Sequence, residues 1–229
     1  ALQFSAMIVL GIVGTPAGGK STAAEFLAGL GAEWINADLI ARSCLNLPAV
    51  MDALIDRFGG SIVDDEGLVN RATVADLVFG DDPVRQENLR FLESQVHPRT
   101  RTEIHRRIAD AAHQQRRVAL LDVPLLFESG WDLGCDAIWC VDAKRENRLR
   151  RSQKRGWDHS ELDRREANQM GIETKCRLSN LVMRNDSTLD ALHENLRRSW
   201  NDLVRMSGSA IPTSRVDIPP HCSSDRVSR

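Results

Sequence analysis

Short runs of β-branched and other apolar residues recur along the chain and predict strands buried on both faces. The first run, MIVLGIV (7–13), leads directly into a glycine-rich loop, and AEWINAD (32–38) follows one helix later. Further candidates are VALLDVPLLF (118–127) and DAIWCVDA (136–143), with a weaker one at NLVMRN (180–185). Because helical patterns separate these runs, the sequence predicts an α/β fold with a doubly wound, mainly five-stranded parallel sheet.

The segments between the strands have apolar side chains at helical spacing. Residues 20–30 form one such segment, and Gly31 is placed to end it. The stretch from residue 39 to about 117 shows no clear strand and contains several helical patterns. Four residues are expected to break these helices: Gly59, Gly60, Pro83 and Pro98. This long stretch predicts a helical subdomain inserted into the sheet.

These patterns divide the chain into one domain, 7–206, and a tail. The tail, 207–229, mixes Ser, Pro and Arg with few large apolar residues, so we expect it to be disordered. Within the domain we predict a core (7–38, 117–144 and 176–206), a helical insertion (about 39–116) and a lid (about 145–175).

Composition limits the classes of partner. The chain has 229 residues, 42% of them hydrophobic, and a formal net charge of -2, so a nucleic acid or membrane partner would need a local basic patch. Its five cysteines lack the spacing of zinc ligands or of a disulfide framework, which favours reduced thiols. The first apolar run is too short to span a bilayer, so we expect a strand there rather than an export signal, and a cytoplasmic protein.

The glycine-rich loop carries the strongest chemical signal. GTPAGGKS matches the phosphate-binding pattern Gly-x4-Gly-Lys-Ser at Gly14, Gly19, Lys20 and Ser21, and it lies between a buried strand and an amphipathic helix. Backbone N–H groups of the loop, including those of Ala17 and Gly18, would surround the phosphates of a nucleotide. That context disfavours a plain glycine turn.

Each side chain at the end of this loop has an expected part in nucleotide binding. Lys20 would place its charge on the transferring phosphates, and Ser21 would place its hydroxyl on Mg²⁺. Thr22 would help to position the start of the helix. We therefore expect ATP as a co-substrate together with Mg²⁺.

The acceptor of the phosphate must be inferred from other segments. The chain lacks the Asn-Lys-x-Asp motif of GTPases, and its third strand ends in Asp122 alone rather than in the Asp-Glu of ring ATPases. A small-molecule kinase needs a carboxylate near the acceptor hydroxyl, and Asp38 at the end of the second strand fits, although a helix N-cap is an alternative. It also needs a basic lid. Arg148, Arg151 and Arg155 share one helix face, although such a face is often only solvated.

The order of several motifs resembles the dephospho-CoA kinase family, from about Ile8 to Trp200. The segment GTPAGGKSTAAEFLAGLGAEWINADLIAR matches the family's first strand, loop and Asp-Ala-Asp region, QVHPRTR matches its His-Pro segment, and PLLFE appears verbatim. Arginines four apart followed by ANQ, ending at Gln169, match its lid, and KCRLSNLVMRN matches its closing segment, with Lys175 and Asn185 retained. The resemblance implies a P-loop nucleotide core, a coenzyme-binding helical insertion and a lid.

The resemblance also implies a reaction, the transfer of the ATP γ-phosphoryl group to the ribose 3′-hydroxyl of dephospho-CoA. Asp38 would accept or orient the hydroxyl proton, while Lys20, Mg²⁺ and Arg151 would neutralise charge on the phosphoryl oxygens. The other implied contacts are Arg155 and Asn185 for the nucleotide, and Arg42, His97 and Glu128 for the acceptor.

Simpler explanations stay open for these four polar residues. His97 before Pro98 can be a helix-breaking corner, Arg42 and Glu128 can form structural salt bridges, and Asn185 can cap the following helix.

Four residues depart from the family pattern. Asn36 stands where the family has its first Asp, so Asp38 alone can be the catalytic carboxylate. Ala17 stands at a usual glycine and Pro16 at a usual hydrophobic residue, and Asn180 replaces an acid in the closing segment.

Two other functions remain open from the sequence. One is a nucleoside monophosphate kinase, and the other is a regulatory or nucleic-acid-associated protein that uses the basic stretches 99–117 and 144–165. We expect ATP and dephospho-CoA as partners, with neither nucleic acid nor a membrane, and leave the oligomeric state open.

Overall fold

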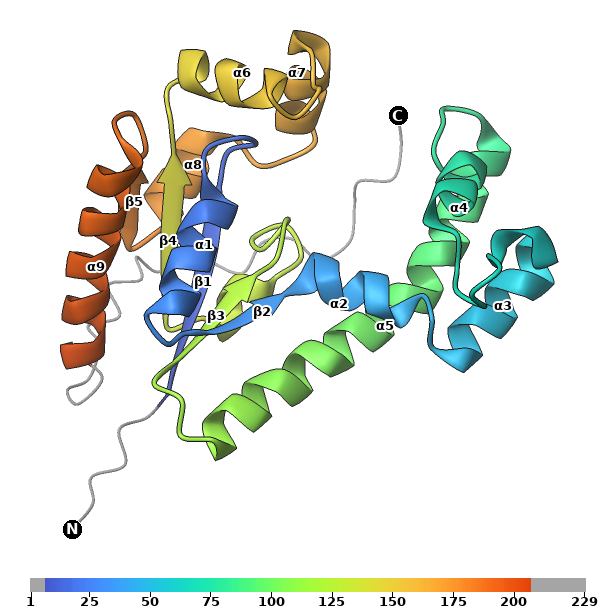
Figure 1. Cartoon of the computed structure of the whole chain (residues 1–229), viewed down its shortest axis with the longest axis horizontal. Helices are drawn as coiled ribbons and strands as arrows, with labels where there is room; N and C mark the ends of the chain where they lie inside the picture. The colour runs from blue at the N-terminus through green and yellow to red at the C-terminus, as the bar shows by residue number, and fades with distance from the viewer. Residues whose placement is uncertain (1–6, 207–229) are drawn as a thin grey trace.

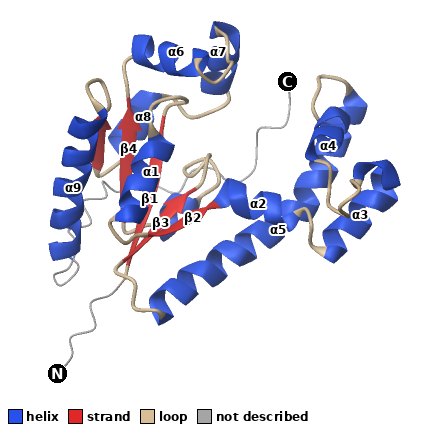
Figure 2. Ribbon diagram, viewed as in Figure 1, coloured by secondary structure: helices blue, strands red, loops and turns tan. Residues whose placement is uncertain are grey.

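A five-stranded, all-parallel sheet forms the centre of the protein. The computed structural model describes residues 7–206, and the predicted tail, 207–229, lies outside them. The strand order β2-β3-β1-β4-β5 places the strand that enters the P-loop at the centre (Figures 1 and 2). The strands are β1 (Ile8–Gly14), β2 (Glu33–Asn36), β3 (Val118–Asp122), β4 (Ala137–Asp142) and β5 (Leu181–Arg184). The predicted five-stranded parallel sheet is thus confirmed.

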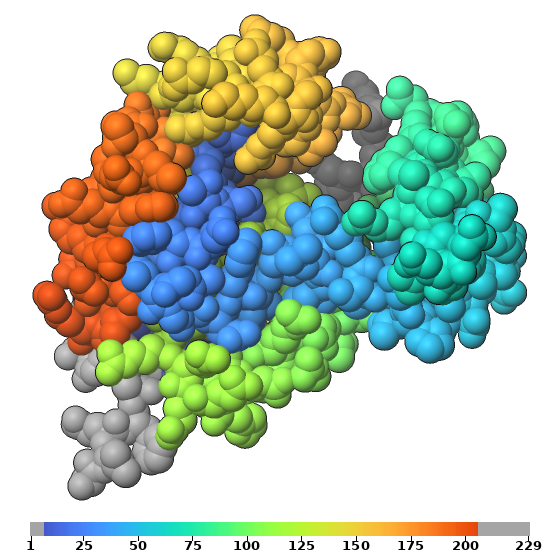
Figure 3. Space-filling model, in the orientation of Figure 1, coloured from blue at the N-terminus to red at the C-terminus, as the bar shows by residue number. Residues whose placement is uncertain are grey.

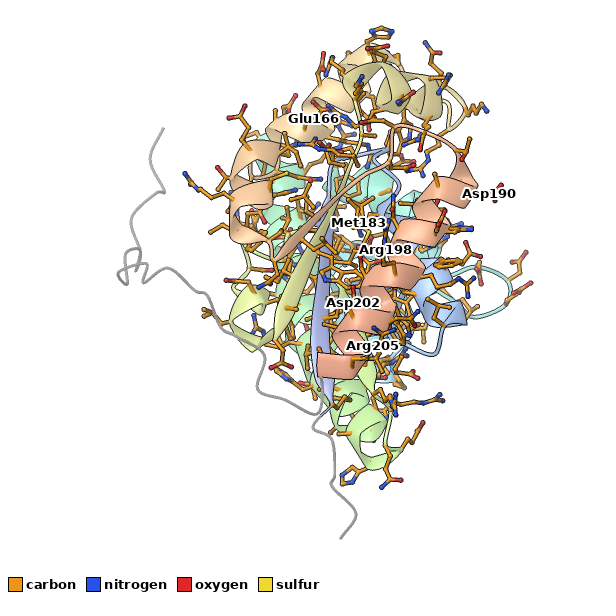
Figure 4. All side chains as sticks on the ribbon, turned by 90° about the vertical axis from the view of Figure 1, so that its left-hand side faces the viewer. Glu166, Met183, Asp190, Arg198, Asp202 and Arg205 are labelled. Atoms are coloured by element: carbon orange, nitrogen blue, oxygen red, sulfur yellow. The ribbon has the colours of Figure 1, made fainter. Side chains whose placement is uncertain are left out.

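Alternating side chains of the central strands build two separate cores. On one face, Leu10 and Ile12 of β1 pack against α1 (Lys20–Gly29) and α9 (Leu189–Met206). On the other face, Val13 and Leu121 belong to a core shared with α2 (Ala37–Cys44), α5 (Pro83–His113) and α8 (Ile172–Leu178). Figure 4 labels Met183 of β5 beside α9, and the labels Asp190 and Arg205 mark the two ends of that helix. The sheet is therefore covered on both faces, as expected for a doubly wound fold.

The segment between β2 and β3 is helical. It contains α2, α3 (Pro48–Phe58), the short 3₁₀ helix η1 (Gly60–Ile62), α4 (Arg71–Val78) and α5. Figure 1 shows α3 and α4 displaced to the side of the sheet, at the far end of α5. Gly59, with φ +85°, ends α3 as expected. None of the described helices combines the length and the apolarity that crossing a bilayer requires.

Of the two prolines predicted to break the helices here, Pro83 does mark the boundary between α4 and α5, whereas the prediction for Pro98 was wrong. Pro83 begins α5, because Asp82 caps the helix by accepting a hydrogen bond from the Arg85 N–H at 3.0 Å. Pro98 lies inside the same 31-residue helix. Burial of Val96 and Ile104 on either side of it holds the helix against the core, so packing outweighs the missing backbone donor.

Three short helices follow β4, and the first two cover the P-loop end of the sheet. They are α6 (Arg145–Gln153), α7 (His159–Ala167) and α8. A one-turn 3₁₀ helix, η2 (Trp131–Gly134), lies between β3 and β4. In the space-filling view α6 and α7 lie above β1 and α1, at the C-terminal end of β1 (Figures 1 and 3).

Candidate active site

The P-loop begins with a tight turn over Thr15–Gly18. The Gly18 N–H donates to the Thr15 carbonyl oxygen at 2.9 Å, and Pro16 occupies the second position, where a turn favours proline and needs no donor. Ala17 occupies the third position with φ +59°, as in a type II turn. This position favours glycine, and a side chain there costs about 1–2 kcal/mol. The unusual Pro16 is therefore well placed, whereas Ala17 is strained.

Close contacts with neighbouring strands fix the rest of the loop. A Cβ at Gly14 would lie 2.2 Å from the Val141 carbonyl oxygen, and one at Gly19 would lie 2.1 Å from Asn185 Nδ2. Thr15 Oγ1 donates to Asp142 Oδ1 at 2.9 Å, and Asn185 Nδ2 donates to the Gly18 carbonyl oxygen at 2.9 Å. The loop is thus held by β4 and by the residue that follows β5.

Lys20 forms an ion pair with Asp122, which ends β3 next to the P-loop strand. Asp122 is only 3% exposed, and its second oxygen accepts a hydrogen bond from Trp34 Nε1 at 3.3 Å. Sequence analysis gave Asp122 no role. The sequence does show that Asp122 ends a buried strand. Its proximity to Lys20 follows only from the strand order, which places this strand beside β1.

A cavity of about 210 Å³ brings several predicted residues together. Lys20, Ser21 and Asp38 line it, so the P-loop and the proposed catalytic carboxylate share one space. The lid contributes four further residues, of which sequence analysis assigned only Arg155 to the site: Arg155, Trp157, Arg165 and Gln169. The guanidinium groups of Arg165 and Arg155 lie over the Trp157 ring, at 4.1 Å and 5.6 Å from its centroid.

Asp38 lies in the first turn of α2 but does not cap it. The cap is Asn36, whose Oδ1 accepts a hydrogen bond from the Leu39 N–H at 3.0 Å. The alternative assignment of Asp38 as an N-cap was therefore wrong. Because Asn caps as well as Asp does, the departure at Asn36 preserves the start of α2. The Asp38 carboxylate is exposed and has no partner among residues 7–206.

A second cavity, of about 340 Å³, adjoins the first and shares Ala17, Gly19 and Arg155 with it. Ala17, Gly19, Thr22, Arg151, Arg155 and Asn185 are among its lining residues. Arg151 donates to the carbonyl oxygens of Gly18 at 3.2 Å and Asn185 at 2.8 Å, and burial lowers the pKa of its guanidinium group. The helix after Asn185 is capped by Thr188, whose Oγ1 accepts from the Ala191 N–H at 3.2 Å. The capping alternative for Asn185 was therefore wrong.

Only two of the three lid arginines reach these cavities. Arg148 is buried, donates to the Ala143 carbonyl oxygen at 2.9 Å and forms an ion pair with Glu166 of α7, which Figure 4 labels in the lid. Arg145 also pairs with Glu166, at 3.2 Å. The expectation that Arg148 shares a phosphate-facing surface was wrong, because this side chain joins α6 to α7.

Three residues predicted to bind the acceptor do not line either cavity: Arg42, His97 and Glu128. Arg42 follows Asp38 by one turn of α2. His97 is exposed within the unbroken helix α5, so it is not a corner. Glu128 accepts a hydrogen bond from the Met170 N–H at 2.6 Å and so connects the loop after β3 to the end of the lid.

Several arginines in the two basic stretches form ion pairs with acids of the same helices. In α5, Arg106 and Arg107 both bind Glu103, at 2.7 and 2.9 Å. In the lid, Arg164 and Arg165 both bind Glu161. Neutralised helix faces of this kind give little support to a nucleic-acid-associated function.

Comparison with known proteins identifies the family. The family model described as dephospho-CoA kinase matches residues 8–191. A dephospho-CoA kinase of Rhodopirellula baltica is 42% identical over 190 residues, which cover 83% of this chain and 86% of the relative. The crystal structure of TT1252 from Thermus thermophilus is 30% identical with a TM-score of 0.68, covering 86% of this chain and 98% of the other.

A dephospho-CoA kinase structure from Campylobacter jejuni is 21% identical with a TM-score of 0.66 and supports the fold. It covers 86% of this chain and 97% of the other. The P-loop kinase fold and the family match agree, and the chain belongs to the dephospho-CoA kinase family.

Proposed function

We propose that the chain transfers the γ-phosphoryl group of ATP to the ribose 3′-hydroxyl of dephospho-CoA in the cavity between the P-loop, α2 and the lid. The observation that carries this proposal is that Lys20, Ser21 and Asp38 line one cavity, which lid residues also line. Phosphoryl transfer needs little covalent chemistry from a protein and depends on positioning and charge stabilisation, which this arrangement supplies.

On the nucleotide side, backbone N–H groups at the start of α1 would bind the ATP phosphates. Lys20 would exchange its ion pair with Asp122 for the transferring phosphate oxygens. Arg151 and Arg155 line the neighbouring cavity, where a nucleotide bound at the P-loop would extend toward Asn185. The donor groups are thus arranged around the place where negative charge develops.

On the acceptor side, Asp38 would orient the 3′-hydroxyl and accept its proton. The hydroxyl oxygen would form the new bond to the γ-phosphorus while the bond to the ADP oxygen breaks, and that oxygen would keep the electron pair. The Asp38 carboxylate is suited to this role because it lines the cavity beside Lys20 and has no described protein partner. Arg42, His97 and Glu128 would contact more distant parts of the acceptor.

The residues near Lys20 suit a magnesium ion that arrives with ATP. The described residues contain no group of three His, Cys, Asp or Glu side chains able to hold a metal, so the phosphates would have to supply ligands. Ser21 and Asp122 offer the hard oxygen donors that Mg²⁺ prefers. Bound there, Mg²⁺ would neutralise charge on the phosphate oxygens. We also propose a cytoplasmic location, where the closely spaced thiols of Cys140 and Cys176 would stay reduced.

The test is ADP release with Mg-ATP in the presence of dephospho-CoA, AMP, CMP or no acceptor, each at the same concentration. We expect release that depends on dephospho-CoA, with CoA as the product. Preference for AMP or CMP would instead support a nucleoside monophosphate kinase. Equal release with and without acceptors would remove the proposed acceptor altogether.

A further inference from the structure

Lys175 is a buried lysine that no role assigned so far explains. It lies in α8 and is 3% exposed, which is rare for a lysine without a paired acid. Its Nζ donates to the Gly14 carbonyl oxygen at 3.3 Å and to Gln169 Oε1 at 2.7 Å. Both acceptors are neutral. Among residues 7–206, Lys175 forms no ion pair.

The two acceptors belong to two different segments that line the catalytic cavity. Gly14 is the first residue of the P-loop, and the close approach of Val141 fixes its backbone. Gln169 follows α7 and lines the cavity together with Lys20 and Asp38. The ammonium group of Lys175 therefore connects the first residue of the P-loop to the residue Gln169 that follows α7 of the lid.

The protein environment disfavours the charge on Lys175. Burial lowers the pKa of its ammonium group, and neighbouring Lys20 lowers this pKa further, while Glu128 and Cys140 act in the opposite direction. An unpaired buried charge destabilises a fold unless something compensates it. The triphosphate of ATP, bound on the far side of Gly14, would provide that compensation.

We propose that Lys175 is a positioning residue for phosphoryl transfer, which sets the P-loop against Gln169 of the lid and has its charge balanced when ATP binds. The proposal rests on the assignment of the cavity to ATP. It makes Lys175 a second cation of the nucleotide site, behind the loop, while Lys20 acts inside the cavity. A purely structural lysine would stabilise the protein equally with and without nucleotide.

The test uses Lys175→Met, which keeps an unbranched side chain one atom shorter and removes the charge, with Lys144→Met at an exposed lysine as a control. Thermal unfolding is measured with and without Mg-ATP, and kcat and KM are measured for both substrates. For Lys175→Met we expect unchanged or higher stability without nucleotide, a clearly smaller ATP-induced shift, and a KM for ATP raised about tenfold. The KM for dephospho-CoA should change little, and Lys144→Met should behave like the wild type.

Gln169→Glu gives an independent variant that serves even if Lys175→Met does not fold. The new carboxylate would pair with Lys175, so it should stabilise the protein without nucleotide and weaken ATP binding. ATP-induced shifts equal to those of the wild type in both variants would overturn the role of Lys175 alone. Absence of an ATP-induced shift in the wild type would overturn this role together with the proposed function.

Discussion

On the nucleotide side of the cavity, Thr15 and Asn185 hold the P-loop through buried hydrogen bonds, whereas on the acceptor side Asp38 and Arg42 project from α2 without a partner among the described residues. The first group is organised before any ligand binds. The second has its side chains free to meet a substrate. With the proposed function, we expect ATP to bind in a prepared site, and the acceptor site to be completed when dephospho-CoA binds.

The strongest test of this difference is Asp38→Asn. We expect kcat to fall by about 10³-fold, because a positioned general base contributes about 10²–10⁴-fold. Stability and ATP affinity should not change, since the Asp38 carboxylate is exposed and bonded to nothing described. Coupled ADP assays, thermal unfolding and ATP titration check these outcomes. The control is Asp202→Asn on the solvent side of α9 (Figure 4), and near-normal turnover in Asp38→Asn would reject the assignment.

On the nucleotide side, Gly19→Ala should have the opposite profile and damage the fold itself. The new Cβ would lie 2.1 Å from Asn185 Nδ2 at a residue with φ +109°. We expect a loss of about 2 kcal/mol or more in the free energy of unfolding, together with loss of ATP binding.

Gly67→Ala is the control that separates the clash with Asn185 from the strain of a positive φ. Gly67 also has a positive φ, +76°, but nothing lies within 4 Å of its added Cβ. Chemical denaturation of both variants should therefore show a larger loss for Gly19→Ala. Equal losses would mean that Asn185 does not hold the loop.

A smaller effect on stability is expected from the ion pairs within α5, a helix on the acceptor side. Hydrogen bonds from Arg106 and Arg107 lower the pKa of Glu103 in α5 from 4.5 to about 2. Because this pKa is depressed, the stabilisation is present above pH 4.5 and is lost as the pH falls toward 2. Glu103 is partly exposed, so we expect about 1 kcal/mol at neutral pH.

Comparison of the wild type with Glu103→Gln by thermal unfolding checks this expectation. The difference should be present at pH 7 and should shrink at pH 3. A difference that is constant with pH would assign the effect to packing rather than to the charge of Glu103. A pH-dependent difference would show that α5 itself is stabilised by ion pairs. Only the side chains that face the substrate would then lack partners on the acceptor side.

The sequence predicts those features that depend on local patterns. The apolar runs indicate the five strands, and the spacing of Gly14, Gly19 and Lys20 indicates the P-loop, because both patterns arise from neighbours along the chain. The Asp122 contact with Lys20 and the Lys175 contact with Gly14 each join residues more than a hundred positions apart, so these contacts follow only from the strand order and the packing of α8.

The wrong predictions have related causes. Helical spacing alone cannot tell which arginines face a cavity, and Arg148 points instead to Glu166 of another helix. A rule for proline based on isolated helices fails at Pro98, where the surrounding residues of α5 are anchored in the core.

The smallest expected effect on stability concerns Ala17, the strained residue of the P-loop on the nucleotide side. Ala17 has φ +59°, and replacing it with glycine should remove about 1–2 kcal/mol of strain, offset by about 0.5–1 kcal/mol from the greater freedom of the unfolded chain. We therefore expect Ala17→Gly to raise the free energy of unfolding by about 0.5–1 kcal/mol, measured from the denaturant midpoint. Gln115→Gly is the matched control, because Gln115 has φ +55° at the end of α5, far along the chain from the P-loop.

A gain at Gln115 without one at Ala17 would mean that the P-loop turn relaxes around its alanine, so that the nucleotide side is less rigid than its hydrogen bonds indicate. A gain at both positions would place the strain in the backbone. Unchanged ATP affinity in Ala17→Gly would then show that Pro16 and the hydrogen bond from Gly18 to Thr15 suffice to set the path of the loop.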